Sequence, residues 1–253
     1  MTARIELVLV RTKEDGNVGA TARVAKNFGA ERLALVAPRA PLGAEARRRS
    51  MAGLPLLRAA RRFRTVAEAL DGIDLVVGTT DLSTGRSTAY LRRSVSPERL
   101  GEMLVPVEGR VALLLGPEDN GLSREELGRC DVLVHVPARR EFPTLNVSHA
   151  AAIVLYAIHR AKGTADPETT PAPLLLGLDG REKELFLARV GELLARIGYP
   201  AHKRKGLILL FRRVLGRSTP TEAEYRMMLG LFHHLDRTMA RWPASPSARR
   251  RRS

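Results

Sequence analysis

Short apolar segments of strand length alternate with helix-like segments in the first part of the chain, and this alternation limits the fold more than any other feature. Residues 5–10 are apolar and rich in branched side chains, and residues 20–28 have helical spacing and stop before Gly29. Residues 33–36 form the next apolar run. A strand, a helix and a strand within so short a stretch predict two parallel strands joined by a right-handed crossover.

The same alternation continues through residue 161. Ser123 and Glu126 have the spacing of a capping box, which predicts a helix start. Further strands are expected at residues 74–78, 110–115 and 131–136, and helices near residues 66–70 and over 146–161. Alternating strands and helices favour an α/β domain with a mostly parallel sheet, which we assign to residues 1–162.

The rest of the chain has a different character. Residues 163–173 are rich in Thr, Pro and acidic side chains without an apolar period, which predicts a linker that we assign to residues 163–180. Residues 181–242 carry three helical patterns and no strand, which predicts a small all-helical extension. Its helices are expected at residues 181–197, 203–215 and 221–242, the last with a capping box at Thr221 and Glu224. The composition of residues 243–253 predicts a disordered basic tail.

The chain carries a surplus of positive charge. Its formal net charge is +15, from 42 Lys and Arg against 27 Asp and Glu, and 36 of these cations are Arg. Codon bias explains a preference for Arg over Lys but not the surplus itself. Because a guanidinium matches phosphate geometry, the surplus favours a nucleic-acid partner. Residues 163–253 hold +8 of it and residues 1–162 hold +7, so the helical extension is the more densely basic part.

Composition also excludes several classes of protein. The single cysteine, Cys130, excludes an intramolecular disulfide framework and a zinc site built from cysteines. The histidines lack the spacing of metal ligands, so we expect no metal. No apolar run reaches the roughly 20 residues that span a bilayer, and the N-terminus lacks the pattern of a secretion signal. We therefore expect a cytoplasmic protein with no membrane contact.

Three loops follow predicted strands at the edge of the sheet where α/β proteins bind ligands. The first carries Asn17, Gly19 and Arg23, the second runs from Gly116 to Leu122 through Glu118, and the third is Thr144 to Ser148. Taken singly, each loop is also explained as a turn that caps a helix. No G-x-G-x-x-G fingerprint and no G-x-S-x-G elbow occurs, which disfavours a dinucleotide-binding enzyme and a serine hydrolase.

In this order the three loops resemble the signature motifs of the SpoU/TrmH class of SPOUT RNA 2′-O-ribose methyltransferases, over residues 4–160. The first motif is N-x-G-x-x-x-R, the second G-x-E-x-x-G-L and the third S/T-L-N-x-S/A. The matching residues are Asn17, Gly19 and Arg23; Gly116, Glu118, Gly121 and Leu122; and Thr144, Leu145, Asn146 and Ser148.

Finer features resemble one branch of that class, whose members methylate the ribose of nucleotide 32 in the tRNA anticodon loop. They are residues 8–12, 76–80 and 141–146 together with the helical extension. One departure is Pro117, where that branch usually has Arg. This departure leaves the reaction unchanged and weakens only the choice of substrate.

The resemblance implies a parallel sheet whose C-terminal segment threads through a deep trefoil knot. It also implies a homodimer, with the helix of residues 146–161 and the first-motif helix at the interface and the active site built across it. S-adenosylmethionine would be held in the knot. The matching cofactor positions are Thr79, Thr80, Asp81, Gly116, Val136, Pro143, Thr144 and Leu145.

The resemblance also assigns catalytic roles. Arg23 matches the arginine at the reacting ribose, where it either loses its proton with help from the RNA phosphate or stays charged and stabilises the developing alkoxide. The second role is favoured, because guanidinium groups stay protonated at neutral pH. Asn17 and Glu118 would position Arg23 and the RNA, while Asn146 and Ser148 would hydrogen-bond near the ribose.

The expected partner is tRNA, gripped by basic side chains of the extension. The candidates are Lys203, Arg204, Lys205, Arg212, Arg213 and the tail residues 249–252, helped by residues 47–49. Each of these is alternatively an ordinary solvated side chain. Two other functions stay open at this point. They are the same chemistry on ribosomal RNA, and an RNA-binding relative without catalysis.

Overall fold

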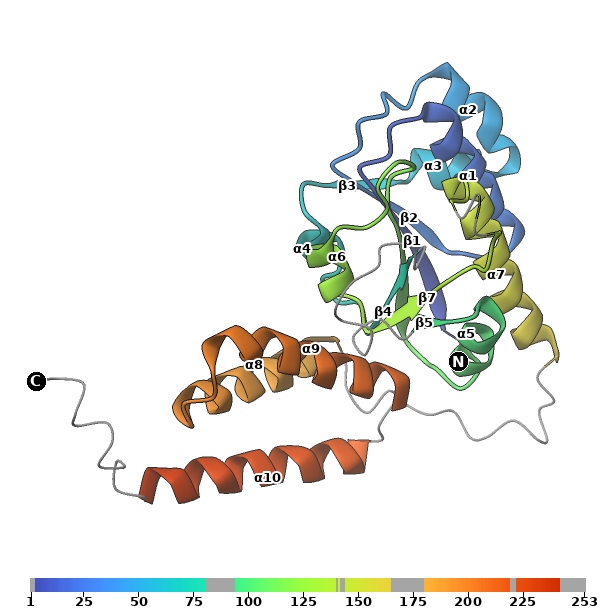
Figure 1. Cartoon of the computed structure of the whole chain (residues 1–253). Coiled ribbons are helices and arrows are strands. Elements are labelled where there is room, and N and C mark those ends of the chain that lie inside the picture. The colour runs from blue at the N-terminus through green and yellow to red at the C-terminus, as the bar shows by residue number, and fades with distance from the viewer. Residues whose placement is uncertain are drawn as a thin grey trace, which may run out of the picture.

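The computed structural model describes residues 3–80, 94–139, 141, 144–164, 180–218 and 222–241. The first part of the chain is an α/β domain, and the last part is a group of roughly antiparallel helices beside it (Figure 1). The described strands form one seven-stranded sheet in the order β3-β2-β1-β6-β4-β7-β5. The strands are β1 (Arg4–Val10), β2 (Arg32–Val36), β3 (Arg61–Phe63), β4 (Leu75–Thr79), β5 (Ser94–Val95), β6 (Arg110–Leu115) and β7 (Val132–Val134).

Every strand pair described in the sheet is parallel, which confirms the predicted parallel α/β sheet. The central pair, β1 and β6, runs in register from Arg4 beside Arg110 to Leu9 beside Leu115. Alternate residues of β1 enter two different cores. Leu7 and Leu9 join one core, while Val8 and Val10 join the other, so both faces of the sheet are buried.

Helices cover both faces of the sheet, as Figure 1 shows. The larger core packs against α1 (Asp15–Asn27), α5 (Pro97–Leu104) and α7 (Val147–Thr164). The smaller core lies under α4 (Val66–Ala69) and α6 (Arg124–Gly128). A further group beside α1 consists of α2 (Ala44–Ser50), the 3-10 turn η1 (Met51–Gly53) and α3 (Leu54–Arg58).

Helix α1 begins at Asp15, five residues before the predicted start. The sequence there reads as a turn because it contains Gly16, Asn17 and Gly19. Gly19 serves packing instead, since a Cβ at this position would lie 2.2 Å from the carbonyl oxygen of Ala46. The glycine therefore lets α1 and α2 approach each other closely, and this contact between helices is invisible in the local pattern.

The C-terminal helices are α8 (Gly180–Arg196), α9 (Ala201–Ser218) and α10 (Glu222–Arg241), close to the predicted bounds. They share a core of their own around Phe186, which meets Phe211, Tyr225 and Phe232 edge to face. The predicted linker is shortened at both ends, because α7 reaches Thr164 and α8 begins at Gly180. Residues 165–179, Thr221 and the tail 243–253 lie outside the described residues.

None of the helices that the structure describes is both long and apolar enough to cross a membrane.

Candidate active site

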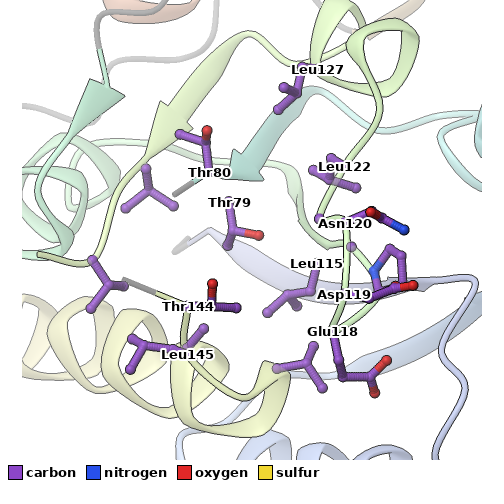
Figure 2. A pocket seen from close by; sticks show the side chains of 17 residues that line it. Thr79, Thr80, Leu115, Glu118, Asp119, Asn120, Leu122, Leu127, Thr144 and Leu145 are labelled. Carbon is purple, nitrogen blue, oxygen red and sulfur yellow. The ribbon is translucent and has the colours of Figure 1, made fainter. Parts of the chain in front are cut away.

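A cavity of about 270 Å³ opens at the carboxyl ends of β4, β6 and β7 (Figure 2). Six of the eight predicted cofactor positions line it together, namely Thr79, Thr80, Gly116, Val136, Thr144 and Leu145. The other two, Asp81 and Pro143, lie outside the described residues. Segments far apart in the sequence thus converge at the edge of the sheet that the strand pattern predicted.

The cavity owes its shape to short backbone contacts. The loop after β6 folds back on itself, with the amide of Gly121 donating to the carbonyl of Pro117 at 3.0 Å. Gly121 has a φ of +61°, which favours glycine. A Cβ on Gly116 would lie 2.2 Å from the carbonyl carbon of Gly121, so Gly116 has no room for a side chain. On the opposite side, the Thr80 amide donates to Val134 and the Thr79 hydroxyl to Leu114.

A chain of hydrogen bonds joins the three motifs. Asn17 donates from Nδ2 to Oε1 of Glu118 at 2.6 Å, and its own Oδ1 accepts from Nδ2 of Asn146 at 2.8 Å. Oδ1 of Asn146 in turn accepts from the amide and the hydroxyl of Ser148, at 2.9 and 2.8 Å. Four of the predicted catalytic residues are therefore one connected network at the rim of the cavity.

Within the described residues, the second carboxylate oxygen of Glu118 is buried and accepts no hydrogen bond. Buried polar atoms are normally satisfied, and an ionised carboxylate accepts several bonds. The oxygen is therefore a ready acceptor beside the cavity, and Glu118 and Asp119 together make this side of the lining acidic.

Arg23 does not join this network within one chain. It lies six residues after Asn17 on α1, which places it about 120° around the helix axis and about 9 Å along it. Its side chain is exposed. Arg23 is therefore a surface side chain that does not line the cavity of its own chain.

The exposed surface of α7, which packs against α1, is partly apolar. On α7, Ile153 and Tyr156 are 39% and 52% exposed. The ring of Tyr156 packs edge to face on Phe28, which follows α1, with 6.0 Å between centroids. Helices α1 and α7 thus form a continuous outer face with large hydrophobic side chains.

Two ion pairs that the sequence did not predict tie the loop after β1 to the second motif and to α6. Arg11 pairs with Glu126 through both carboxylate oxygens, and Lys13 pairs with Asp119. The hydrogen bond to Glu126 raises the pKa of Arg11. Burial raises the pKa of Glu126, but Arg11 and the Ser123 amide outweigh it and the net pKa is lowered. The partners are more than 100 residues apart in sequence, so no local pattern indicates them.

The predicted capping box is confirmed, and it supports the same region. Ser123 accepts from the amide of Glu126, and the Glu126 side chain accepts from the amide of Ser123. Helix α6 therefore starts at a fixed place directly after the second motif.

The predicted RNA contacts divide into two groups. Lys203 and Lys205 are exposed at the start of α9, and Arg204 between them is half-buried and donates to the carbonyl of Tyr199. Arg212 and Arg213 require a correction. Arg212 is bound by Glu184 through two hydrogen bonds, and Arg213 is 5% exposed and donates to Leu127. Guanidinium groups packed against protein in this way do not face an RNA.

Residues 47–49 lie at the end of α2 and are exposed. Arg48 and Arg49 pair with Glu45, and the Arg49 side chain lies over Gly16, next to Asn17. The tail residues 249–252 lie outside the described residues.

The described residues contain no group of three or more His, Cys, Asp and Glu side chains arranged to hold a metal ion. Cys130 is fully buried, and this burial raises the pKa of its thiol to about 12. The thiol therefore stays protonated at neutral pH.

Comparisons with known proteins agree with the geometry. The model of the SpoU rRNA Methylase family matches residues 4–156. The tRNA (cytidine-2′-O-)-methyltransferase TrmJ of Methanocaldococcus jannaschii is 30% identical over 238 residues, which covers 92% of this chain and 100% of the relative. The tRNA (cytidine/uridine/adenosine-2′-O-)-methyltransferase TrmJ of Pseudomonas aeruginosa is 32% identical and covers 92% and 93%.

A solved structure supports the same family. The crystal structure of TrmJ from Z. mobilis ZM4 superposes with a TM-score of 0.67 at 27% identity, over 91% of this chain and 98% of that one. The motifs, the cavity at the carboxyl ends of the strands and these matches together establish that the chain belongs to the SpoU rRNA Methylase family.

Proposed function

We propose that the chain transfers the methyl group of S-adenosylmethionine to a ribose 2′-hydroxyl of tRNA, at nucleotide 32 of the anticodon loop. The observation that carries this proposal is the network from Glu118 through Asn17 and Asn146 to Ser148. It gathers the polar residues of three separate motifs at one cavity. The TrmJ relatives, which match almost the whole chain, support tRNA as the substrate.

The cavity fits this cofactor chemically. Aliphatic side chains such as Leu115 and Val136 line one part, and the hydroxyls of Thr79, Thr80 and Thr144 lie in another. Glu118 adds negative charge, whereas the charge of Asp119 is balanced by Lys13, and this suits a ligand with a sulfonium and an ammonium group. The cofactor supplies an electrophilic methyl group on its sulfur, and these residues would hold it.

The active site is proposed to form across a homodimer. Arg23 is exposed and does not line the cavity of its own chain, while α7 presents the apolar side chains Ile153 and Tyr156. Pairing two copies through this face would cover the apolar area and bring Arg23 of one copy toward the cavity of the other. A two-fold axis would build two equal sites.

In the proposed mechanism Arg23 stays charged. It orients the phosphate beside the target nucleotide and stabilises the charge that develops on the ribose oxygen as the hydroxyl proton passes to water. Asn17 and Asn146 fix each other, so the second N–H of each amide can donate to the ribose without reorganising. Glu118 holds Asn17 in place and has one further oxygen to accept a bond.

The proposed RNA surface has two parts. Lys203 and Lys205, with Arg204, offer phosphate contacts at the start of α9. Arg49 offers another close to Asn17, since its guanidinium lies over Gly16. Arg212 and Arg213 are not part of this RNA surface, because both pack against the protein.

We further propose that the segment from β7 to α7 completes a trefoil knot, and that the protein acts in the cytoplasm. For the knot, the supporting observation is the tight fold of the 116–122 loop beside residues 144–147, which share the cavity lining. Stretching a single molecule from both ends would leave a shortened contour if the chain is knotted.

Ribosomal RNA is the second candidate substrate, because the matching family is named after rRNA methylation. Purified protein with labelled S-adenosylmethionine on tRNA and rRNA transcripts separates the two. We expect label on tRNA, and its confinement to rRNA would refute the proposal. Arg23→Ala should abolish transfer with unchanged cofactor affinity, whereas Lys26→Ala, another exposed cation of α1, should remain active.

A further inference from the structure

A buried charge cluster joins the helical extension to the first domain. Asp131 directly precedes β7 and is completely buried. Its Oδ2 accepts from the amide of Val76 at 2.8 Å and from Nζ of Lys183 at 2.6 Å. Its Oδ1 lies 3.5 Å from the guanidinium of Arg212. Lys183 belongs to α8 and Arg212 to α9, so both helices reach the same carboxylate.

The cations are committed to this contact. Lys183 is 5% exposed, and its ammonium also donates to the carbonyl of Asp74 at 2.8 Å. Arg212 is held from the other side by Glu184, at 2.6 and 2.7 Å. An unpaired charge in such surroundings is strongly unfavourable, so undocking the helices requires all of these groups to separate and rehydrate together.

The backbones also fit closely. A Cβ on Gly180, at the start of α8, would lie 2.0 Å from the carbonyl oxygen of Ile73, and one on Gly216 in α9 would lie 2.6 Å from Cβ of Asp131. The Gly180 amide donates to Oδ1 of Asp74 at 3.1 Å. These glycines let two helices rest directly on the amino ends of β4 and β7.

The docking point and the cavity lie at opposite ends of the same strands. Asp131 and Val136 are five residues apart, about 17 Å in extended chain, and Val136 lines the cavity. From Gly216 near the cluster to Lys203 is 13 residues of α9, about 20 Å. Helix α9 is therefore an arm fixed at one end with its basic turn at the other. Figure 1 shows α8 and α9 lying along the lower edge of the domain.

We propose that Asp131, Lys183 and Arg212 form a latch that fixes this arm, so that Lys203 and Lys205 stand at a constant distance from the cavity. Lys183 is then a positioning residue for tRNA. A rotation of about 20° at the latch would move a tip 20 Å away by about 7 Å, about twice the roughly 3.4 Å of helix axis per phosphate of one strand. The part of this proposal that concerns tRNA rests on the proposed function, whereas the docking itself does not.

Lys183→Met in the full chain removes the charge and keeps an unbranched side chain that is one heavy atom shorter. We expect faster amide hydrogen exchange at the start of α8 and the end of α9, with unchanged exchange in the sheet. The KM for tRNA should rise about tenfold, with kcat and cofactor affinity unchanged. Arg189→Met, an exposed cation of the same helix, is the control and should match the wild type in every measurement.

A second variant guards against misfolding. Lys183→Arg keeps a cation, and it should retain more protection in α8 than Lys183→Met does. Wild-type exchange in Lys183→Met would overturn the latch, and so would faster exchange throughout the sheet in both variants. If the wild type methylates no tRNA, the exchange experiment still decides whether the latch exists, so the two failures are distinguishable. Loosened α8 with an unchanged KM for tRNA would overturn the positioning role.

Discussion

Replacing Gly116 with alanine tests whether the cavity is the cofactor site. A Cβ at this position would lie 2.2 Å from the carbonyl carbon of Gly121 and 2.4 Å from the amide nitrogen of Leu122. Both neighbours are backbone atoms and cannot rotate away. Non-bonded carbon atoms need more than 3 Å, so the 116–122 loop must retreat by about 1 Å. This loop carries Glu118 and Asp119 and forms one wall of the cavity.

A displacement of about 1 Å at reacting groups costs on the order of 100-fold in rate. We therefore expect Gly116→Ala to weaken S-adenosylmethionine binding in calorimetry and to lower kcat/KM by about that factor. Gly128→Ala is the matched control, because a Cβ there meets nothing within 4 Å. If Gly116→Ala binds the cofactor as tightly as Gly128→Ala does, the assignment of this cavity is refuted.

Four further outcomes are expected. Mixing inactive Arg23→Ala and Asn146→Ala subunits should restore about a quarter of wild-type activity, because half of the dimers then hold one intact site of two; no recovery would contradict a site shared across the dimer. Glu118→Gln should lower kcat more than Asp119→Asn in single-turnover methylation, since only Glu118 holds Asn17. Lys203→Ala with Lys205→Ala should reduce the slope of log K against log salt for tRNA by about 1.5 to 2 in binding titrations, and an unchanged slope would remove α9 from the RNA surface. The pKa of Glu126 is lowered by Arg11, so its contribution to stability is complete above the unfolded pKa and is lost as pH falls through the folded one. Thermal unfolding should accordingly lose more stability between pH 6 and pH 3 in the wild type than in Glu126→Gln.

The sheet could be predicted because each of its longer strands is visible in the local sequence as a run of apolar residues. Residues 110–115 were predicted as a strand and are β6. Each such run is mostly apolar, since both faces of a parallel sheet are covered. The elements that were missed are short or polar. Strand β3 is Arg61–Phe63 with two exposed arginines, and β5 has two residues. Their pairing comes from neighbouring strands and not from their own composition.

Helix α5 was missed although a signal was present. Ser96 accepts from the amide of Arg99 and Pro97 stands at the first helical position, which together are a helix start. Leu100 and Leu104 are four residues apart in α5, so both lie on its buried face, and α5 packs against α7.

The candidate site was predicted in part. The resemblance implied Thr79, Gly116 and Thr144 as cofactor positions, and they line one cavity because the carboxyl ends of parallel strands meet at one edge. The contacts that hold the site in place were not predictable. Asp131 and Lys183 form a pair although they are 52 residues apart in sequence. Arg212 has the sequence pattern of a surface cation, but α9 places it beside Asp131. Charge alone does not tell an RNA contact from a buried ion pair, since both need the same residue type.

Mapping the modified nucleotide tests the central claim most directly. Transcribed tRNA is incubated with the protein and S-adenosylmethionine, digested, and read by mass spectrometry beside a sample treated with Arg23→Ala. The account predicts one added methyl on the ribose of nucleotide 32 with the wild type and none with the variant. A methyl group on a base, at another nucleotide, or equally abundant with Arg23→Ala would contradict it.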